Sequence, residues 1–194
     1  MIVNPQEFFE TIRDTLFRGE LTKPQVDGIN SILQTWASVS ANSDPRFVAY
    51  SLGTIFHETG CAMQPVTEIL KGIGKPYGVK VPPFDQAYYG RGLIQLTWAW
   101  NYTKADVALH RMGFFKGDEN LTQTPDLALR PDVAGAIAVA GMTEGWFTGR
   151  KLADFFIGTR SDWVDARTII NGHDRAALVA AYALHFYDAI IAGS

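Results

Sequence analysis

Only one of the 194 residues is a cysteine, Cys61, so the chain cannot form an internal disulfide or a site of several thiolates. The chain also has no excess of basic residues: it contains 17 lysines and arginines and 20 aspartates and glutamates, which gives a net charge of −3. A nucleic-acid-binding domain carries a basic excess, and none is present. No apolar run approaches the roughly 18 residues of a membrane span. We therefore expect no nucleic-acid partner, no membrane insertion, and no metal or other cofactor.

The start of the chain lacks the features of a Sec signal peptide. The stretch MIVNPQEFFETIRD has neither a basic beginning nor an apolar run behind it. The expectation is a chain that is synthesised in the cytoplasm without a Sec signal peptide. If it acts elsewhere, something other than its own leader must carry or release it.

The composition and length favour one packed domain over residues 1–194, expected to be a monomer. Apolar residues make up 47% of the chain and charged residues 19%, which supports a buried core and argues against disorder. A length of 194 residues fits one domain, and no repeat, linker or change of composition marks a second.

Helical periodicity dominates the chain outside one long segment. Residues 61–92 hold so many glycines and prolines that we expect an irregular segment there, with a short β-hairpin. The fold class expected is mainly α, a single domain with one long Gly/Pro-rich insertion. Capping residues and apolar spacing predict helices over residues 4–16, 22–36, 44–59, 97–110, 131–147, 161–170 and 174–191.

Glu58 stands out at the end of the predicted helix 44–59. It lies about 80° from the centre of the apolar stripe, at the stripe's border, and in the last turn, where the helix dipole is negative. Partial burial and the negative helix end both favour the neutral, protonated carboxyl. A protonated carboxyl is what a general acid needs, although a solvated surface glutamate would also fit this position.

Glu68 follows ten residues later, inside the irregular segment. Two carboxyl groups can act together on a glycosidic bond, one protonating the leaving oxygen and the other activating water. The spacing alone does not identify such a pair, because 20 acidic residues offer many combinations.

The densest local pattern is YYGRGLIQLTW at residues 88–98, which continues to Asn101. Two glycines allow a tight backbone path around Arg91. Gln95, Thr97 and Asn101 then place amide and hydroxyl groups among aromatic rings, which is the mixture typical of a sugar-binding site. The alternative is a turn followed by a helix whose aromatic side chains pack in the core.

Three segments follow one another along the chain, FHETG at 56–60, YYGRGLIQLT at 88–97 and IING at 169–172. They resemble, in the same order, motifs of glycoside hydrolase family 19, which includes chitinases and a branch of phage endolysins. Residues 126–130 and 146–154 fit that family's downstream helices, and residues 21–30 are similar to its phage and bacterial lysozyme-like branch.

The resemblance implies a lysozyme-like, bilobed fold and an inverting, single-displacement hydrolysis. It implies that Glu58 is the general acid, that Glu68 is the general base and that Thr97 holds the attacking water. The remaining residues matched to the family are the sugar-binding amides of Gln95, Asn101 and Asn171, and Tyr89, which would line the cleft.

Two substrates share the β-1,4-linked N-acetylhexosamine that such a pair would cleave. We expect peptidoglycan, cleaved by an endolysin or muramidase acting in the periplasm or cell wall, with chitin oligosaccharides as the alternative. A holin-type release partner, or an inhibitor or immunity protein, would fit the first of these.

Two other classes of function remain open. His57 and Cys61 are four residues apart, and on one helix face they would suggest a cysteine-dependent cell-wall amidase. A sugar-binding protein with an inactive site is the second alternative. Exchanging Cys61 for Ser would inactivate the amidase, whereas exchanging Glu58 for Gln would inactivate the glycosidase.

Overall fold

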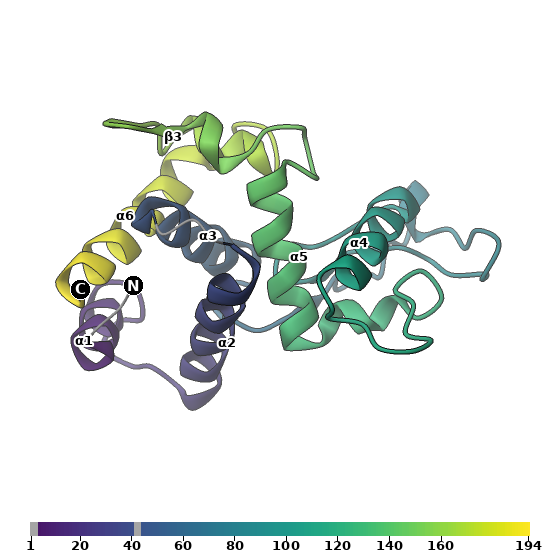
Figure 1. The fold of residues 1–194 in the computed structure, drawn as a ribbon, viewed down its shortest axis with the longest axis horizontal. Helices are drawn as coiled ribbons and strands as arrows, with labels where there is room; N and C mark the ends of the chain where they lie inside the picture. Colours follow the sequence, from purple (N-terminus) through teal and green to yellow (C-terminus); the bar gives the residue numbers. More distant parts are fainter. Residues whose placement is uncertain (1–3, 41–43) are drawn as a thin grey trace.

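A computed structural model of the chain describes residues 4–40 and 44–194, and its architecture is mainly α-helical (Figure 1). Residues 1–3 and 41–43, which belong to the expected single domain, lie outside the described residues. No helix in the described part has both the length and the apolarity needed to cross a bilayer. The α-helices described are α1 (Pro5–Thr15), α2 (Lys23–Val39), α3 (Pro45–Glu58), α4 (Ala99–Arg111), α5 (Pro131–Glu144) and α6 (Ala176–Ala192).

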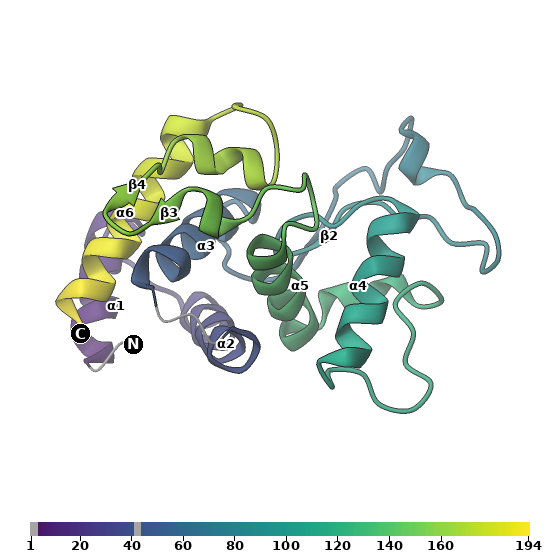
Figure 2. The ribbon, with the colours of Figure 1, turned by 45° about the horizontal axis from the view of Figure 1, so that its top comes forward.

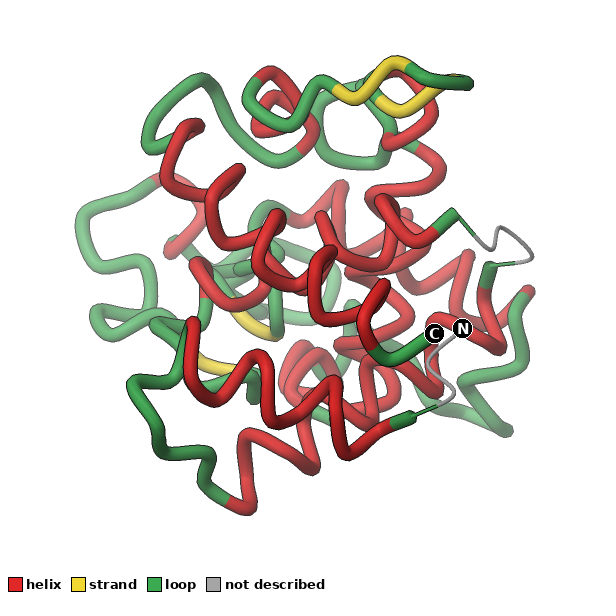
Figure 3. Tube along the Cα trace, turned by 90° about the vertical axis from the view of Figure 1, so that its left-hand side faces the viewer, coloured by secondary structure: helices red, strands yellow, loops and turns green. Residues whose placement is uncertain are grey.

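The strands are short and form two separate antiparallel pairs (Figure 3). β1 (Val66–Thr67) pairs with β2 (Arg91–Gly92), and β3 (Phe156–Ile157) pairs with β4 (Arg160–Ser161). Short 3-10 helices connect the longer elements, namely η1 (Pro76–Gly78), η2 (Pro125–Leu129), η3 (Leu152–Asp154) and η4 (Asp165–Ile169).

The predicted helix starts at Asn4 and Asp44 are confirmed. The Asn4 side chain accepts a hydrogen bond from the backbone N–H of Glu7 at 3.3 Å, and the Asp44 carboxylate accepts one from the N–H of Arg46 at 2.9 Å. Each cap satisfies a backbone donor that has no partner within the helix, and a proline follows at the first helical position.

The core of the larger lobe is built around α3, which is buried continuously from Phe47 to Phe56. α3 packs along α6, while α1 also packs on α6 and α2 packs on α5. A Cβ at Gly53 would lie 2.6 Å from the backbone nitrogen of Ala183, so α3 and α6 approach this closely only because residue 53 is glycine.

Two lobes lie on either side of α5 (Figures 1 and 2). The larger lobe contains α1, α2, α3 and α6, and the smaller contains α4 and the loops around it. The mainly α, bilobed fold expected from the sequence is therefore confirmed.

Residues 61–92 are irregular, as their glycines and prolines predict. In place of the expected short β-hairpin, β1 pairs with β2, and residues 68–90 separate these two strands. Residue Thr67 pairs with Arg91, so the sheet closes the segment into a loop beside α5 (Figure 2).

The helix expected over 161–170 is only a 3-10 helix at Asp165–Ile169, α5 ends at Glu144 rather than at residue 147, and two predicted helix starts are wrong. α4 begins at Ala99 rather than Thr97, because Trp98 has a left-handed backbone (φ 70°) that a helix excludes. Ser161 does not begin a helix: it lies in β4, where its hydroxyl accepts a hydrogen bond from Arg46 Nη1 at 3.0 Å. The Ser161 hydroxyl, which the local sequence suggested as a helix cap, is thus bonded instead to a residue of α3.

Candidate active site

Glu58 is the last residue of α3, and its side chain is 17% exposed. Its Oε1 lies 2.7 Å from Nη1 of Arg167, and this bond is an ion pair between α3 and η4. The position at the helix end and the partial burial agree with the sequence prediction.

Arg167 is the partner that sequence reasoning missed. Its side chain is only 3% exposed, and its Nε donates to the carbonyl of Asp174 at 3.2 Å. The sequence prediction for Glu58 considered only partial burial and the helix end, whereas the structure adds a guanidinium at hydrogen-bond distance. The two residues are 109 positions apart, and no local pattern links them.

Glu68 follows directly after β1 and is bound at both carboxylate oxygens. Oε2 accepts a hydrogen bond from the N–H of Gly90 at 3.0 Å, and Oε1 accepts one from the hydroxyl of Tyr77 at 3.0 Å. The backbone N–H of Glu68 also donates to the carbonyl of Gly90 at 2.8 Å. The carboxylate is therefore held in one orientation at the end of the small sheet.

Gly90 has no side chain and so leaves room for the neighbouring side chains. A Cβ on Gly90 would lie 2.6 Å from Oε1 of Gln95 and 3.3 Å from Cβ of Glu68. Gln95 itself donates from Nε2 to the carbonyl of Val66 at 3.1 Å. The glycine thus lets Glu68 and Gln95 approach the same point of the backbone.

One open cavity of about 590 Å³ brings these residues together. Glu58 borders it from the end of α3, Glu68 from the end of β1, and Gln95 from the turn after β2. The full lining consists of Glu58, Thr59, Val66, Thr67, Glu68, Ile69, Leu70 and Gln95. The structure therefore places three of the seven residues selected from the sequence around one space.

Thr97 and Asn101 are close in sequence to Gln95 but do not line this cavity. The Asn101 side chain donates to the carbonyl of Thr97 at 3.1 Å, so its amide is used within the chain. Thr97 is half-buried between Gln95 and Trp98, both of which have left-handed backbones (φ 54° and 70°). Backbones of this kind are costly for non-glycine residues and tend to occur at functional sites.

Tyr89 and Asn171 also lie outside the lining of this cavity. The guanidinium carbon of Arg91 lies 3.5 Å from the centre of the Tyr89 ring, and both residues border a different depression. Asn171 is exposed, and its Oδ1 accepts a hydrogen bond from the N–H of Gly172 at 2.9 Å. Their expected contacts with sugar remain predictions.

Arg91, at the centre of the conspicuous YYGRG pattern, has a structural role. Its side chain is 4% exposed; Nε donates to Oδ1 of Asp126 at 2.7 Å and Nη1 donates to the Tyr102 hydroxyl at 3.1 Å. Nη1 also donates to the carbonyl of Ala87 at 3.2 Å. Arg91 thus joins the irregular segment to α4 and η2.

Cys61 does not lie on a helix face with His57, because α3 ends at Glu58 and Cys61 has a left-handed backbone (φ 70°). Burial raises the pKa of the Cys61 thiol, which disfavours the thiolate that a nucleophile needs. The helical arrangement on which the amidase alternative was based is therefore wrong.

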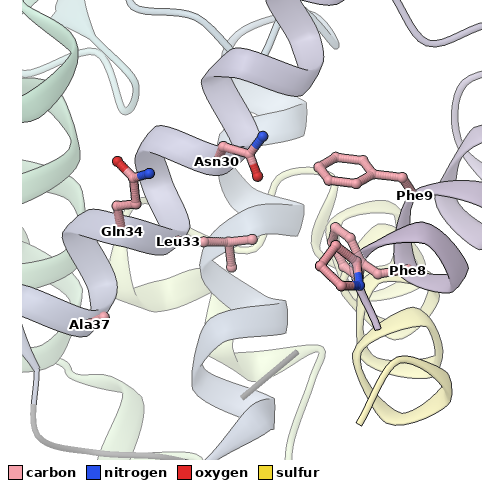
Figure 4. A pocket seen from close by; sticks show the side chains of 7 residues that line it. Phe8, Phe9, Asn30, Leu33, Gln34 and Ala37 are labelled. Carbon is pink, nitrogen blue, oxygen red and sulfur yellow. The ribbon is translucent and has the colours of Figure 1, made fainter. Parts of the chain in front are cut away.

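A separate groove lies between α1 and α2 (Figure 4). Phe8 and Phe9 face Asn30 and Leu33 across it, and none of its lining residues is acidic or basic. In the described chain, no group of three or more metal-ligating side chains gathers at any point. The groove between the helices offers no acid–base chemistry, in contrast to the cavity between Glu58 and Glu68.

The mainly α, bilobed architecture is shared with solved structures of chitinases. Chitinase C from Streptomyces griseus HUT6037 superposes with a TM-score of 0.59 at 20% identity, covering 97% of this chain and 76% of that chain. A bacterial family 19 chitinase superposes with a TM-score of 0.56 at 20% identity, covering 98% of this chain and 95% of that one.

Among curated sequences, Endochitinase CHI from Arabidopsis thaliana is 27% identical over 172 residues. The match covers 84% of this chain but only 57% of the plant protein, so the chain spans less than two thirds of that relative. No family model matches. The fold is the fold of family 19 chitinases, and the resemblance to glycoside hydrolase family 19 is confirmed.

Proposed function

We propose that the chain hydrolyses β-1,4 bonds between N-acetylhexosamines by a single displacement that inverts the anomeric carbon. Glu58 protonates the oxygen of the leaving sugar, and Glu68 takes a proton from the water that attacks the opposite face. The observation that carries the proposal is that these carboxyl groups come from different elements and border one cavity.

The surroundings of Glu68 suit a general base. Both of its oxygens accept hydrogen bonds, from Gly90 and from Tyr77, and these bonds fix its orientation. Each oxygen can accept a further hydrogen bond, so an attacking water can be bound and oriented there.

The role of Glu58 requires that its carboxyl be protonated when the substrate is bound. Arg167 bonds Oε1, so the proton transferred to the leaving sugar is assigned to Oε2. In this arrangement the protonated carboxyl keeps Oε1 against Arg167 and presents Oε2 to the glycosidic oxygen.

The proposal also gives roles to the other predicted residues. Gln95 uses its Nε2 for the carbonyl of Val66, which leaves its Oε1 available as an acceptor for a sugar N–H or O–H. Thr97 is proposed to hold the attacking water, and Asn101, Tyr89 and Asn171 to contact more distant sugars. Apolar faces and acetyl methyl groups of the sugar would pack on the exposed side chains that line the cavity, Ile69 and Leu70.

The comparisons support chitin as the substrate more strongly than peptidoglycan, which was expected first. The curated relative is named an endochitinase, and the structural neighbours are described as chitinases. Peptidoglycan remains the second candidate because residues 21–30 are similar to the phage and bacterial lysozyme-like branch. Action in the cell wall, with a holin-type partner or an inhibitor protein, belongs to that second candidate.

The test is product analysis on purified glycans. The protein is incubated with N-acetylglucosamine oligosaccharides and with isolated peptidoglycan, and the products are identified by mass spectrometry and by the anomeric signals in NMR. We expect α-anomeric chains from the oligosaccharides. Glu58→Gln and Glu68→Gln should each lower kcat at least about a hundredfold, because each removes a proton-transfer group.

The matched control is Glu10→Gln, on the exposed face of α1, which should leave turnover unchanged. Binding of oligosaccharide without release of products would favour the inactive sugar-binding protein. Loss of activity in Cys61→Ser together with full activity in Glu58→Gln would restore the amidase.

A further inference from the structure

The hydroxyl of Tyr77 is one of the two groups that hold the Glu68 carboxylate. Tyr77 belongs to η1, is half-buried, and donates to Oε1 of Glu68 at 3.0 Å. The other oxygen, Oε2, is held by the backbone N–H of Gly90 at 3.0 Å. A backbone donor and a phenol therefore fix the plane of the carboxylate from two sides.

The ring of Tyr77 is itself held in place. It meets the ring of Trp98 edge to face, with centroids 5.5 Å apart and planes at 74°. Trp98 stacks on Trp100 at 4.5 Å, and the carbonyl of Tyr77 accepts a hydrogen bond from the N–H of Tyr88 at 3.0 Å. Contacts at the ring and at the backbone thus keep the hydroxyl directed at Glu68.

Burial and the neighbouring Glu68 carboxylate both raise the pKa of Tyr77. The phenol therefore remains protonated across the pH range in which glycosidases act, and it serves as a hydrogen-bond donor throughout. Neither motif matching nor residue spacing pointed to Tyr77, because η1 lies within the irregular segment, nine residues after Glu68.

We infer that Tyr77 is a positioning residue for Glu68: its hydroxyl fixes the orientation in which that carboxylate meets the attacking water. The inference rests on the proposed function, in which Glu68 is the general base. As the water oxygen bonds to the anomeric carbon, its proton passes to Glu68, the glycosidic bond breaks, and the leaving oxygen receives the proton of Glu58. Tyr77 keeps its own proton throughout.

The first test is Tyr77→Phe, which removes the hydroxyl and keeps the ring against Trp98. On N-acetylglucosamine oligosaccharides we expect kcat to fall about tenfold to a hundredfold, as for other displacements of a reacting group. KM should stay within about twofold, because the lost interaction serves the transition state rather than substrate binding. The matched control is Tyr88→Phe, which removes a tyrosine hydroxyl bonded to the carbonyl of Thr122 at 2.8 Å in the same lobe and should leave kcat unchanged.

The second test places the same exchange in a Glu68→Gln background. If Tyr77 acts only through Glu68, the double variant should have the residual activity of Glu68→Gln alone, because effects exerted through one group are not additive. Further loss in the double variant, or a kcat in Tyr77→Phe equal to that of Tyr88→Phe, would overturn the inference while the wild type remains active. A wild type inactive on every glycan would instead refute the proposed function.

Discussion

At the level of single residues, the ion pair with Arg167 holds one oxygen of Glu58, the proposed acid. The arginine of this pair is 3% exposed, whereas in the pair between Glu144 and Arg111 the side chains are 46% and 63% exposed. Removing one partner of a buried pair leaves an uncompensated charge with little access to water. The pair therefore couples the stability of the fold to the residue proposed as the acid.

We predict that Arg167→Met destabilises the protein by about 3 kcal/mol, the cost typical of breaking a buried pair. Urea unfolding at neutral pH measures this loss. Adding Glu58→Gln should recover part of it, because the unpaired charge is removed together with its partner. The double variant therefore lies closer to wild type than Arg167→Met alone.

The control for this prediction is Arg111→Met, which breaks the exposed pair with Glu144 and should cost less than about 1 kcal/mol. Equal losses at Arg167 and Arg111 would contradict the argument, since burial would then have no effect. If the double variant of Arg167→Met and Glu58→Gln were less stable than Arg167→Met alone, the Glu58 carboxylate would stabilise the fold in some other way.

Among the elements, α3 connects the capped helix start at Asp44 with the candidate site at Glu58. Glu58 ends the helix, and at its start the Asp44 side chain caps the backbone and pairs with Arg46 Nη2 at 2.6 Å. Arg46 in turn donates to the carbonyl of Arg160 in β4 at 3.0 Å. The position of Glu58 thus depends on a helix whose start is tied to the β3–β4 pair.

The stability contributed by Asp44 should depend on pH. Its hydrogen bond with the Arg46 guanidinium holds the pKa of Asp44 below the usual value of about 4. The stabilisation is therefore complete above about pH 4 and is lost as the pH falls through the lowered pKa. In urea unfolding, Asp44→Asn should be less stable than wild type at pH 7, and the difference should shrink in acid.

Asp44→Ala separates the charge from the cap. It removes the capping oxygen as well and should cost about 1 kcal/mol, whereas Asn still caps the helix. A gap between wild type and Asp44→Asn that stayed constant from neutral pH to acid would contradict the assignment of the charge effect to Arg46.

The elements that could be predicted are those that local chemistry determines. Asn4 and Asp44 cap helices as expected, because a cap needs only its own neighbouring backbone. The turn before α4 was missed, because the left-handed backbone of Trp98 is maintained by contacts with Tyr77 and by its N–H bond to the carbonyl of Tyr88 at 2.9 Å. Such contacts are absent from any local window of sequence.

The same distinction applies to the candidate site. Glu58, Glu68 and Gln95 were selected from the sequence, and the cavity brings them together. Arg167 and Tyr77 were not selected, because each reaches its carboxylate only after the chain has folded. A motif identifies residues of the right chemistry, whereas the groups that orient them come from distant or irregular parts of the chain.

At the scale of the molecule, the proposed acid and base come from different structural units. Glu58 belongs to the helical core of the larger lobe, and Glu68 belongs to the segment that the β1–β2 sheet closes. Arg91 stabilises that segment through Asp126 and Tyr102. The relative placement of the two carboxyl groups therefore depends on Arg91, although Arg91 does not line the cavity.

We predict that Arg91→Lys loosens the segment while the larger lobe stays folded. Lysine keeps the positive charge but cannot donate in the fixed fork with which arginine reaches several acceptors at once. Hydrogen exchange should accelerate at the amides of Glu68 and Leu96, which donate to the carbonyls of Gly90 and Arg91 beside the small sheet, and should be unchanged in α3. Because Glu68 would lose its fixed orientation, kcat should fall about tenfold or more.

The control is Arg130→Lys, whose guanidinium bonds Glu119, Asp132 and the carbonyl of Phe114, all of which lie outside β1 and β2. It should leave exchange at Glu68 unchanged. Faster exchange throughout α3 in Arg91→Lys would mean that the two lobes unfold as one unit. In that case Arg91 would stabilise the whole molecule rather than the alignment of Glu68 with Glu58, and the division of the site between two structural units would be wrong.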